Sequence, residues 1–107
     1  MLEFATTNEE KVKVTAAPQT AGGHPASIDG ALRVTINSGS ATVVQDPATP
    51  LEITFVSSDV PGDTEGVIEA DVDLGSGVEL IQEAFRYSVT SAKAAALGFT
   101  VGAAEPK

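Results

Sequence analysis

Alternating apolar and polar residues between positions 65 and 89 constrain the fold of this chain most strongly. Within residues 65–74 every second residue is small or apolar, namely Gly66, Ile68, Ala70, Val72 and Leu74. Residues 80–89 repeat the pattern with Ile81, Phe85, Tyr87 and Val89, and Glu83 interrupts it. A period of two is typical of a strand with one buried face. Because Gly and Ser are frequent in the connector at residues 75–79, a hairpin that holds the core is predicted.

Similar short alternating runs, separated by turn residues, occupy much of the remaining chain. They predict further strands at residues 2–6, 11–17, 31–37, 41–45 and 51–57. Asp29-Gly30 is expected to form a turn, and Phe99 and Val101 a last short strand contact. Residues 91–97 are expected to form one helical turn or irregular chain. This spacing indicates an all-β fold, a β-sandwich of seven to eight short antiparallel strands, with a small barrel as the alternative.

The length of the chain, 107 residues, predicts a single domain. We divide it into an N-terminal edge segment at residues 1–9, the sandwich at residues 10–101 and a C-terminal tail at residues 102–107. The sequence shows neither the pattern of a secretory signal nor an apolar run long enough to cross a membrane. We therefore expect either that the protein works where it is made or that a leader has been removed.

Charge and cysteine content exclude several classes of function. The formal net charge is −9, from 15 acidic and 6 basic residues. Such a chain repels phosphate backbones and anionic headgroups, so binding to nucleic acid or to a membrane surface is disfavoured. The chain has no cysteine, which leaves neither a disulfide framework nor a thiolate metal site.

Four aspartates are the candidate metal ligands: Asp59, Asp63, Asp71 and Asp73. Ca²⁺ takes several oxygen ligands at once, and loops at one end of a sandwich can supply them. The helix–loop–helix calcium pattern itself fails, because Gln82 stands where the pattern needs a bidentate glutamate. The preferred interpretation is a solvated outer strand face, whose acids also discourage edge-to-edge pairing.

Residues for catalysis are scarce. His24 is the only histidine, and it lies in a Gly-Gly-His-Pro loop in which nothing orients its ring. A glycosidase would need a cleft with aromatic platforms for sugars, but the chain has no Trp and one Tyr. We therefore expect no catalytic residue, no cofactor and no enzymatic activity.

Several segments resemble small stand-alone immunoglobulin-like (Ig-like) proteins of phage and prophage regions, which are similar to the group 2-type bacterial Ig-like domains. They are Lys-Val-Lys-Val-Thr-Ala-Ala-Pro at residues 11–18, Gly-His-Pro-Ala-Ser-Ile-Asp-Gly at 23–30, Asp-Val-Asp-Leu-Gly-Ser-Gly-Val-Glu-Leu-Ile at 71–81, and the Ala-Leu-Gly-Phe and Glu-Pro-Lys of the ending. Members often carry an aromatic residue, typically Trp, on the strand where this chain has Arg33-Val34. That departure implies a differently packed core.

The resemblance implies an Ig-like β-sandwich and a non-enzymatic role as a virion accessory, such as a decoration or tail component. It carries over no functional residue. The partners would be other proteins, including further copies of the chain, and the protein would be virion-associated after synthesis in the cytoplasm. The alternative is a carbohydrate- or cell-surface-binding module, with calcium as an assisting ion. The loops at residues 20–26 and 58–63 and the connector at residues 75–79 are the expected binding segments.

Overall fold

The computed structural model describes residues 1–93 and 97–107, and the described chain contains strands and no helix. The seven strands in it are β1 (Leu2–Thr7), β2 (Lys11–Thr15), β3 (Ser27–Ser38), β4 (Thr42–Val44), β5 (Glu52–Val56), β6 (Gly62–Asp73) and β7 (Val78–Thr90). The prediction of an all-β fold is therefore confirmed. The central hairpin is also confirmed, although both of its strands are longer than the alternation indicated.

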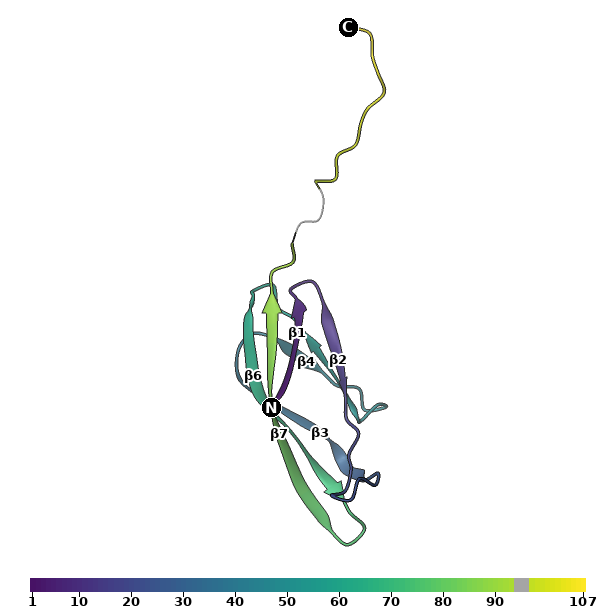
Figure 1. Cartoon of the computed structure of the whole chain (residues 1–107), viewed down its shortest axis with the longest axis vertical. Coiled ribbons are helices and arrows are strands. Elements are labelled where there is room, and N and C mark those ends of the chain that lie inside the picture. Colours follow the sequence, from purple (N-terminus) through teal and green to yellow (C-terminus); the bar gives the residue numbers. More distant parts are fainter. Residues whose placement is uncertain (94–96) are drawn as a thin grey trace.

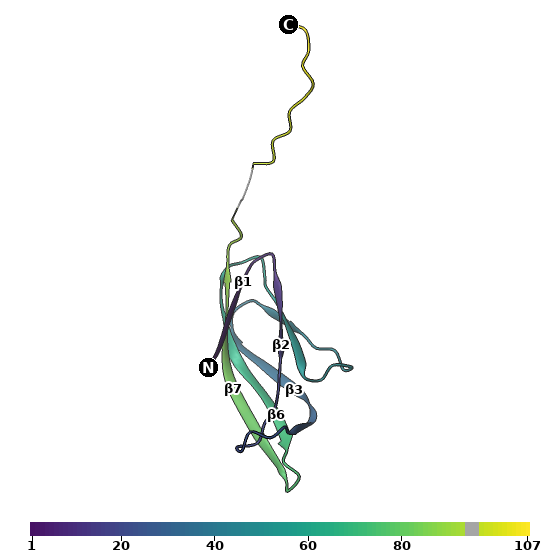
Figure 2. The ribbon, with the colours of Figure 1, turned by 45° about the vertical axis from the view of Figure 1, so that its right-hand side comes forward.

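The strands form two sheets that face each other (Figures 1 and 2). The larger sheet has the order β1-β7-β6-β3, and the smaller sheet has the order β2-β5-β4. Every pair is antiparallel except β1 and β7, which run parallel. The prediction of antiparallel strands is thus wrong for β1. No hairpin joins β1 to β7, because the chain visits the other sheet between them.

The core lies between the sheets and is built on four aromatic rings. Phe55 of β5 is fully buried, with its ring centroid 4.9 Å from that of Phe4 and 5.0 Å from that of Phe85. Phe4 in turn stacks on Tyr87 at 5.0 Å. The predicted inward positions of the hairpin hold for Ala70, Val72, Phe85, Tyr87 and Val89, all of which are buried. The first strand, expected only as an edge segment, supplies Phe4 to this core.

Two polar side chains inside the core have hydrogen-bond partners. Thr64 is buried on β6, and its Oγ1 accepts a 3.1 Å hydrogen bond from the backbone N–H of Ala41 beside the smaller sheet. The hydroxyl groups of Tyr87 and Thr6 lie 2.5 Å apart and share a hydrogen bond. Both contacts satisfy polar atoms that would destabilise the fold if they were buried alone.

The Asp29-Gly30 pair does not form the predicted turn. It lies inside β3, where the register against β6 shifts between Asp29 and Arg33. Gly30 has a φ of 90°, a conformation that glycine adopts readily, so the strand bulges there and continues. Asp29-Gly30 therefore indicated an unusual backbone conformation correctly, but the strand begins before this pair and not after it.

The chain leaves the sandwich at Thr90, the last residue of β7. The strand contact predicted at Phe99 and Val101 is wrong, because both side chains are exposed and residues 97–107 have no regular structure. The tail extends away from the sandwich (Figure 1), and the described chain measures 85 Å along its longest axis against 26 and 24 Å across. The helical turn proposed for residues 91–97 falls partly on residues 94–96, which lie outside the described residues.

Candidate functional site

The outer face of the larger sheet carries the acidic side chains that alternation turned outward, and two arginines pair with them. The Nε of Arg33 lies 3.2 Å from Glu69, and its Nη1 lies 3.3 Å from Asp71. Arg86 pairs through Nε with Glu65 at 2.9 Å. These side chains are partly or largely exposed, and such surface pairs contribute little to the free energy of unfolding because solvent screens them. This face is therefore a solvated surface held together by cross-strand pairs.

The pKa of Glu69 is lowered, first because Gln82 donates a hydrogen bond of 2.8 Å to it and then because Arg33 does so. Hydrogen bonds to Asp71 and, to a smaller extent, to Glu69 raise the pKa of Arg33. A carboxyl group whose pKa is lowered in the folded state stabilises the fold when the pH is above the ordinary pKa of the group, 4.5. That stabilisation is lost as the pH falls through the lower, folded-state pKa.

Replacing Glu69 with Gln is expected to reduce the loss of stability on acidification. The measurement is urea unfolding at several pH values below about 5. In this range the Glu69 carboxyl group is protonated to different extents in the folded and the unfolded protein. Glu105→Gln, in the tail, is the matched control and should leave the acid dependence as it is. Identical acid dependence in Glu69→Gln and the unmodified chain would contradict the role given to this carboxylate.

The four candidate calcium ligands do not converge. Asp63 lies near the start of β6 and Asp71 near its end, which separates them by about 26 Å at about 3.3 Å per residue. Asp71 pairs with Arg33, and Asp73 accepts a 2.8 Å hydrogen bond from the N–H of Gly75. Within residues 1–93 and 97–107, no group of three His, Cys, Asp or Glu side chains is placed to hold a metal ion.

His24 lies in a surface turn that its backbone stabilises. The N–H of His24 donates to Oγ1 of Thr20 at 3.2 Å, and its carbonyl oxygen accepts from the N–H of Thr20 at 2.8 Å. The described residues offer the imidazole ring no hydrogen-bond partner. The structure therefore gives His24 a place in a turn and no orienting group of the kind that a catalytic histidine needs.

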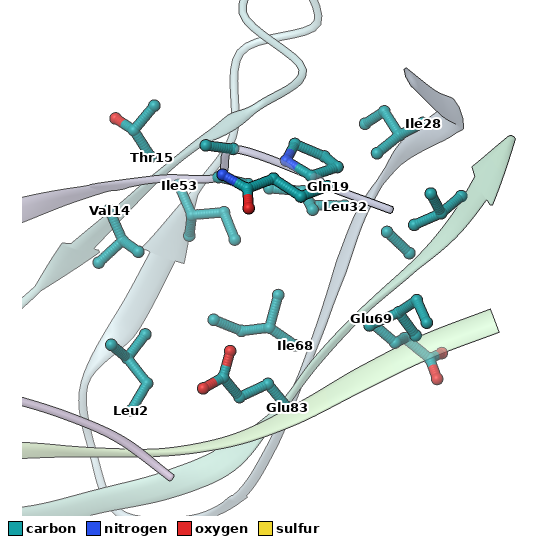
Figure 3. Close-up of a pocket in the computed structure, with 16 residues that line it drawn as sticks. Leu2, Val14, Thr15, Gln19, Ile28, Leu32, Ile53, Ile68, Glu69 and Glu83 are labelled. Carbon is teal, nitrogen blue, oxygen red and sulfur yellow. The ribbon is translucent and has the colours of Figure 1, made fainter. Parts of the chain in front are cut away.

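An open cleft of about 390 Å³ separates the two sheets at the end where the β6–β7 hairpin turns (Figure 3). This volume is in the range of about 300–1,000 Å³ that is common for binding sites. Its walls are mostly aliphatic, with Leu2, Ile28, Ile68 and Ile81 from the larger sheet's strands and Val14 and Ile53 from the smaller sheet. We call it the intersheet cleft.

The chemistry of the intersheet cleft favours apolar side chains over a reacting substrate. Glu69 and Glu83 are the acidic residues that line it, but the carboxylate of Glu69 is bound by Gln82 and Arg33 on the outer face of the sheet. None of the described residues that line the cleft is aromatic, so sugar rings find no stacking platform there. The cleft can bind apolar groups by removing them from water.

Beside the cleft, one stretch of β7 has an unpaired edge. Strand β1 begins its pairing at Leu2, opposite Phe85, so it covers only the second half of β7. On the other side β6 pairs with β7 from Val78 onward. Among the described residues no strand pairs with the remaining edge of residues 78–84. We call residues 78–84 the open edge, and an edge of this kind can accept another strand.

The open edge exposes apolar side chains on both faces. Val78, Leu80 and Ile81 are 55%, 52% and 48% exposed. The prediction of a buried Ile81 is wrong, because the smaller sheet does not reach this end of the hairpin and the residue lies at the cleft mouth. A signal was present in the sequence: Leu80 and Ile81 are consecutive, so one of them had to point outward.

Comparisons with known proteins found no matching family model, no matching curated protein and no matching solved structure. Within the described residues, no helix has the length and apolar character needed to span a membrane. The site that the structure defines is therefore described by its own geometry, as an apolar cleft and an open strand edge at one end of an all-β, two-sheet protein.

Proposed function

We propose that the protein is a non-enzymatic structural component of a phage or prophage particle that works by binding other protein chains through its open edge. The observation that carries this proposal is the combination of unpaired backbone and exposed apolar side chains at residues 78–84. Main-chain hydrogen bonds give affinity when a strand is added to such an edge, and neighbouring pockets give specificity. The intersheet cleft supplies that pocket.

The strand order supports an Ig-like identity for the sandwich. The constant-type Ig arrangement places its second, fifth and fourth strands in that order in one sheet and its third, sixth and seventh in the other. Here the corresponding rows are β2-β5-β4 and β3-β6-β7. The difference lies in the first strand, which pairs with β7 in place of β2. The particle-associated role itself rests on the sequence resemblance to Ig-like phage proteins.

The electrostatics also fit a protein partner. The arginines of the outer face are engaged by Glu65, Glu69 and Asp71, and the whole chain carries a net charge of −9. A polyanion would be repelled by such a surface, whereas a protein strand of neutral or basic character would not. Glu79 and Glu83 of the open edge add negative charge on the cleft side of β7, which further selects against acidic partners.

The test is the protein composition of purified particles. Particles released from a host that encodes the chain should contain it in fixed stoichiometry after gradient purification, as measured by quantitative mass spectrometry. Added salt should release it only weakly, because apolar burial and main-chain hydrogen bonds depend little on ionic strength. Complete absence of the chain from such particles would contradict the proposed role.

A further inference from the structure

The described tail contains a second strand-like pattern that the sandwich does not use. Leu97, Phe99 and Val101 alternate with Gly98 and Thr100, so in an extended conformation the three large side chains share one face. They are 81%, 85% and 96% exposed. An exposed aromatic residue flanked by two aliphatic ones on one face is an unpartnered apolar stripe, and the chain offers an unpartnered apolar edge to match it.

We infer that residues 97–101 of one chain add as a strand to the open edge of a second copy, with Leu97, Phe99 and Val101 turned into the intersheet cleft. This inference rests on the proposed function, since it takes the open edge as the contact surface and names a further copy of the chain as the partner. The residues of β7 that share a face with buried Phe85 are Glu83, Ile81 and Glu79. An added strand would therefore place its apolar stripe over Ile81, which lines the cleft and is half exposed.

Charge selects this segment for this edge. The edge carries Glu79 and Glu83, and on β6 Asp71 and Asp73 pair with Leu80 and Val78 of the edge. Most other strands of this acidic chain would bring further carboxylates to that place, which costs free energy between directly opposed residues. Residues 97–104 contain no charged side chain. The tail segment therefore meets no like charge on docking.

The length of the connection assigns the segment to a second copy. The tail leaves at Thr90, at the end of the sandwich opposite the hairpin turn (Figures 1 and 2). From Thr90 back to Ala84 the distance along β7 is about 20 Å, and the seven steps from Thr90 to Leu97 span at most about 25 Å when fully extended. The difference of about 5 Å is too short for the chain to reverse and pass around β1, which already occupies the path beside β7. A tail pointing outward reaches a neighbouring molecule without this constraint.

A contact of this kind joins two different surfaces, so each copy both donates and accepts a strand. Repetition of such a contact closes into a ring or extends into a filament. The expected behaviour is reversible, concentration-dependent assembly in which the tail supplies the donor segment. Either product would suit a component that is repeated in a particle.

Two single substitutions separate donor from acceptor. Phe99→Asp removes the central side chain of the donor stripe and leaves the sandwich untouched, and Ile81→Asp places a charge on the acceptor edge at a residue that is already half exposed. Val60→Asp adds the same charge at an exposed apolar residue outside the edge and the tail, and it serves as the matched control. Circular dichroism establishes that each variant keeps its β structure.

The experiment is sedimentation velocity over a concentration series. The unmodified chain and Val60→Asp should assemble, whereas Phe99→Asp, Ile81→Asp and a chain ending at Lys93 should each weaken assembly by about tenfold or more. A mixture of Phe99→Asp with Ile81→Asp should give a one-to-one heterodimer and nothing larger, because each retains the half that the other lacks. A monomeric unmodified chain would overturn the inference, and so would assembly that survives removal of the tail. Neither result would bear on whether purified particles contain the chain, so the proposed function is tested separately.

Discussion

Replacing Phe55 with alanine is expected to lower the free energy of unfolding by about 3–5 kcal/mol. Phe55 is fully buried, and its ring contacts the rings of Phe4, Phe85 and Tyr87 from the opposite sheet. The substitution removes apolar area from the core and leaves a cavity that strands on both sides cannot easily fill. Because a domain of this size has a total stability of about 5–15 kcal/mol, the variant should be close to unfolding at room temperature.

Chemical denaturation monitored by Tyr87 fluorescence or by circular dichroism measures this loss. Phe99→Ala is the matched control, since it makes the same substitution at a ring that is 85% exposed. It should change the free energy of unfolding of the isolated chain by no more than about 0.5 kcal/mol. A loss below about 1 kcal/mol for Phe55→Ala would mean that the two sheets do not pack through this ring.

Replacing Gly66 with alanine is expected to cost about 3 kcal/mol, the upper part of the range for overpacked sites. Gly66 lies on β6 between Ile36 of β3 and Phe85 of β7, on the face that points to the core. A Cβ atom there would overlap the carbonyl oxygen of Thr35 and lie 2.9 Å from Cε1 of Phe85. The carbonyl is part of the backbone of a paired strand, so the clash can be relieved only by moving β3 away from β6.

The same denaturation experiment measures the effect of Gly66→Ala. Gly102→Ala in the tail is its control, because nothing lies within 4 Å of the added Cβ atom. The control should unfold like the unmodified chain. If Gly66→Ala were as stable as the control, the close approach of β3, β6 and the Phe85 ring at this position would be wrong.

The regular part of the fold could be predicted because it depends on local pattern. The alternation in β6 and in the second half of β7 placed Ala70, Val72, Phe85 and Tyr87 in the core, where the structure has them. That pattern is a property of consecutive residues, so no knowledge of distant strands was needed. The outward acids of β6 were correct for the same reason.

The errors arise where a distant element decides the outcome. Ile81 has the right position for burial, but whether it is buried depends on how far the smaller sheet extends, which its own sequence neighbours do not encode. The parallel pairing of β1 with β7 likewise joins the first and the last strand of the sequence. Gly30 shows a third kind of error, since its positive φ serves a bulge as readily as a turn.

The candidate site was only partly accessible from the sequence. The expected binding connector at residues 75–79 overlaps the start of the open edge, but the edge itself depends on how much of β7 pairs with β1, which alternation cannot reveal. The cleft needs residues from β1, β2, β3, β5, β6 and β7 in one place, so it is a product of the topology. Three of the four candidate calcium ligands, Asp63, Asp71 and Asp73, are spread along β6, and Asp59 lies before that strand.

Binding of chain variants to particles that lack the endogenous chain tests the central claim most directly. Equal amounts of the unmodified protein, Ile81→Asp and Val60→Asp are added, and the bound fraction is measured after gradient purification. If the open edge is the contact surface, the bound fraction of Ile81→Asp should be lower by about tenfold or more, and Val60→Asp should bind like the unmodified chain. Equal binding of all three proteins would show that the contact with other chains does not use the open edge of β7.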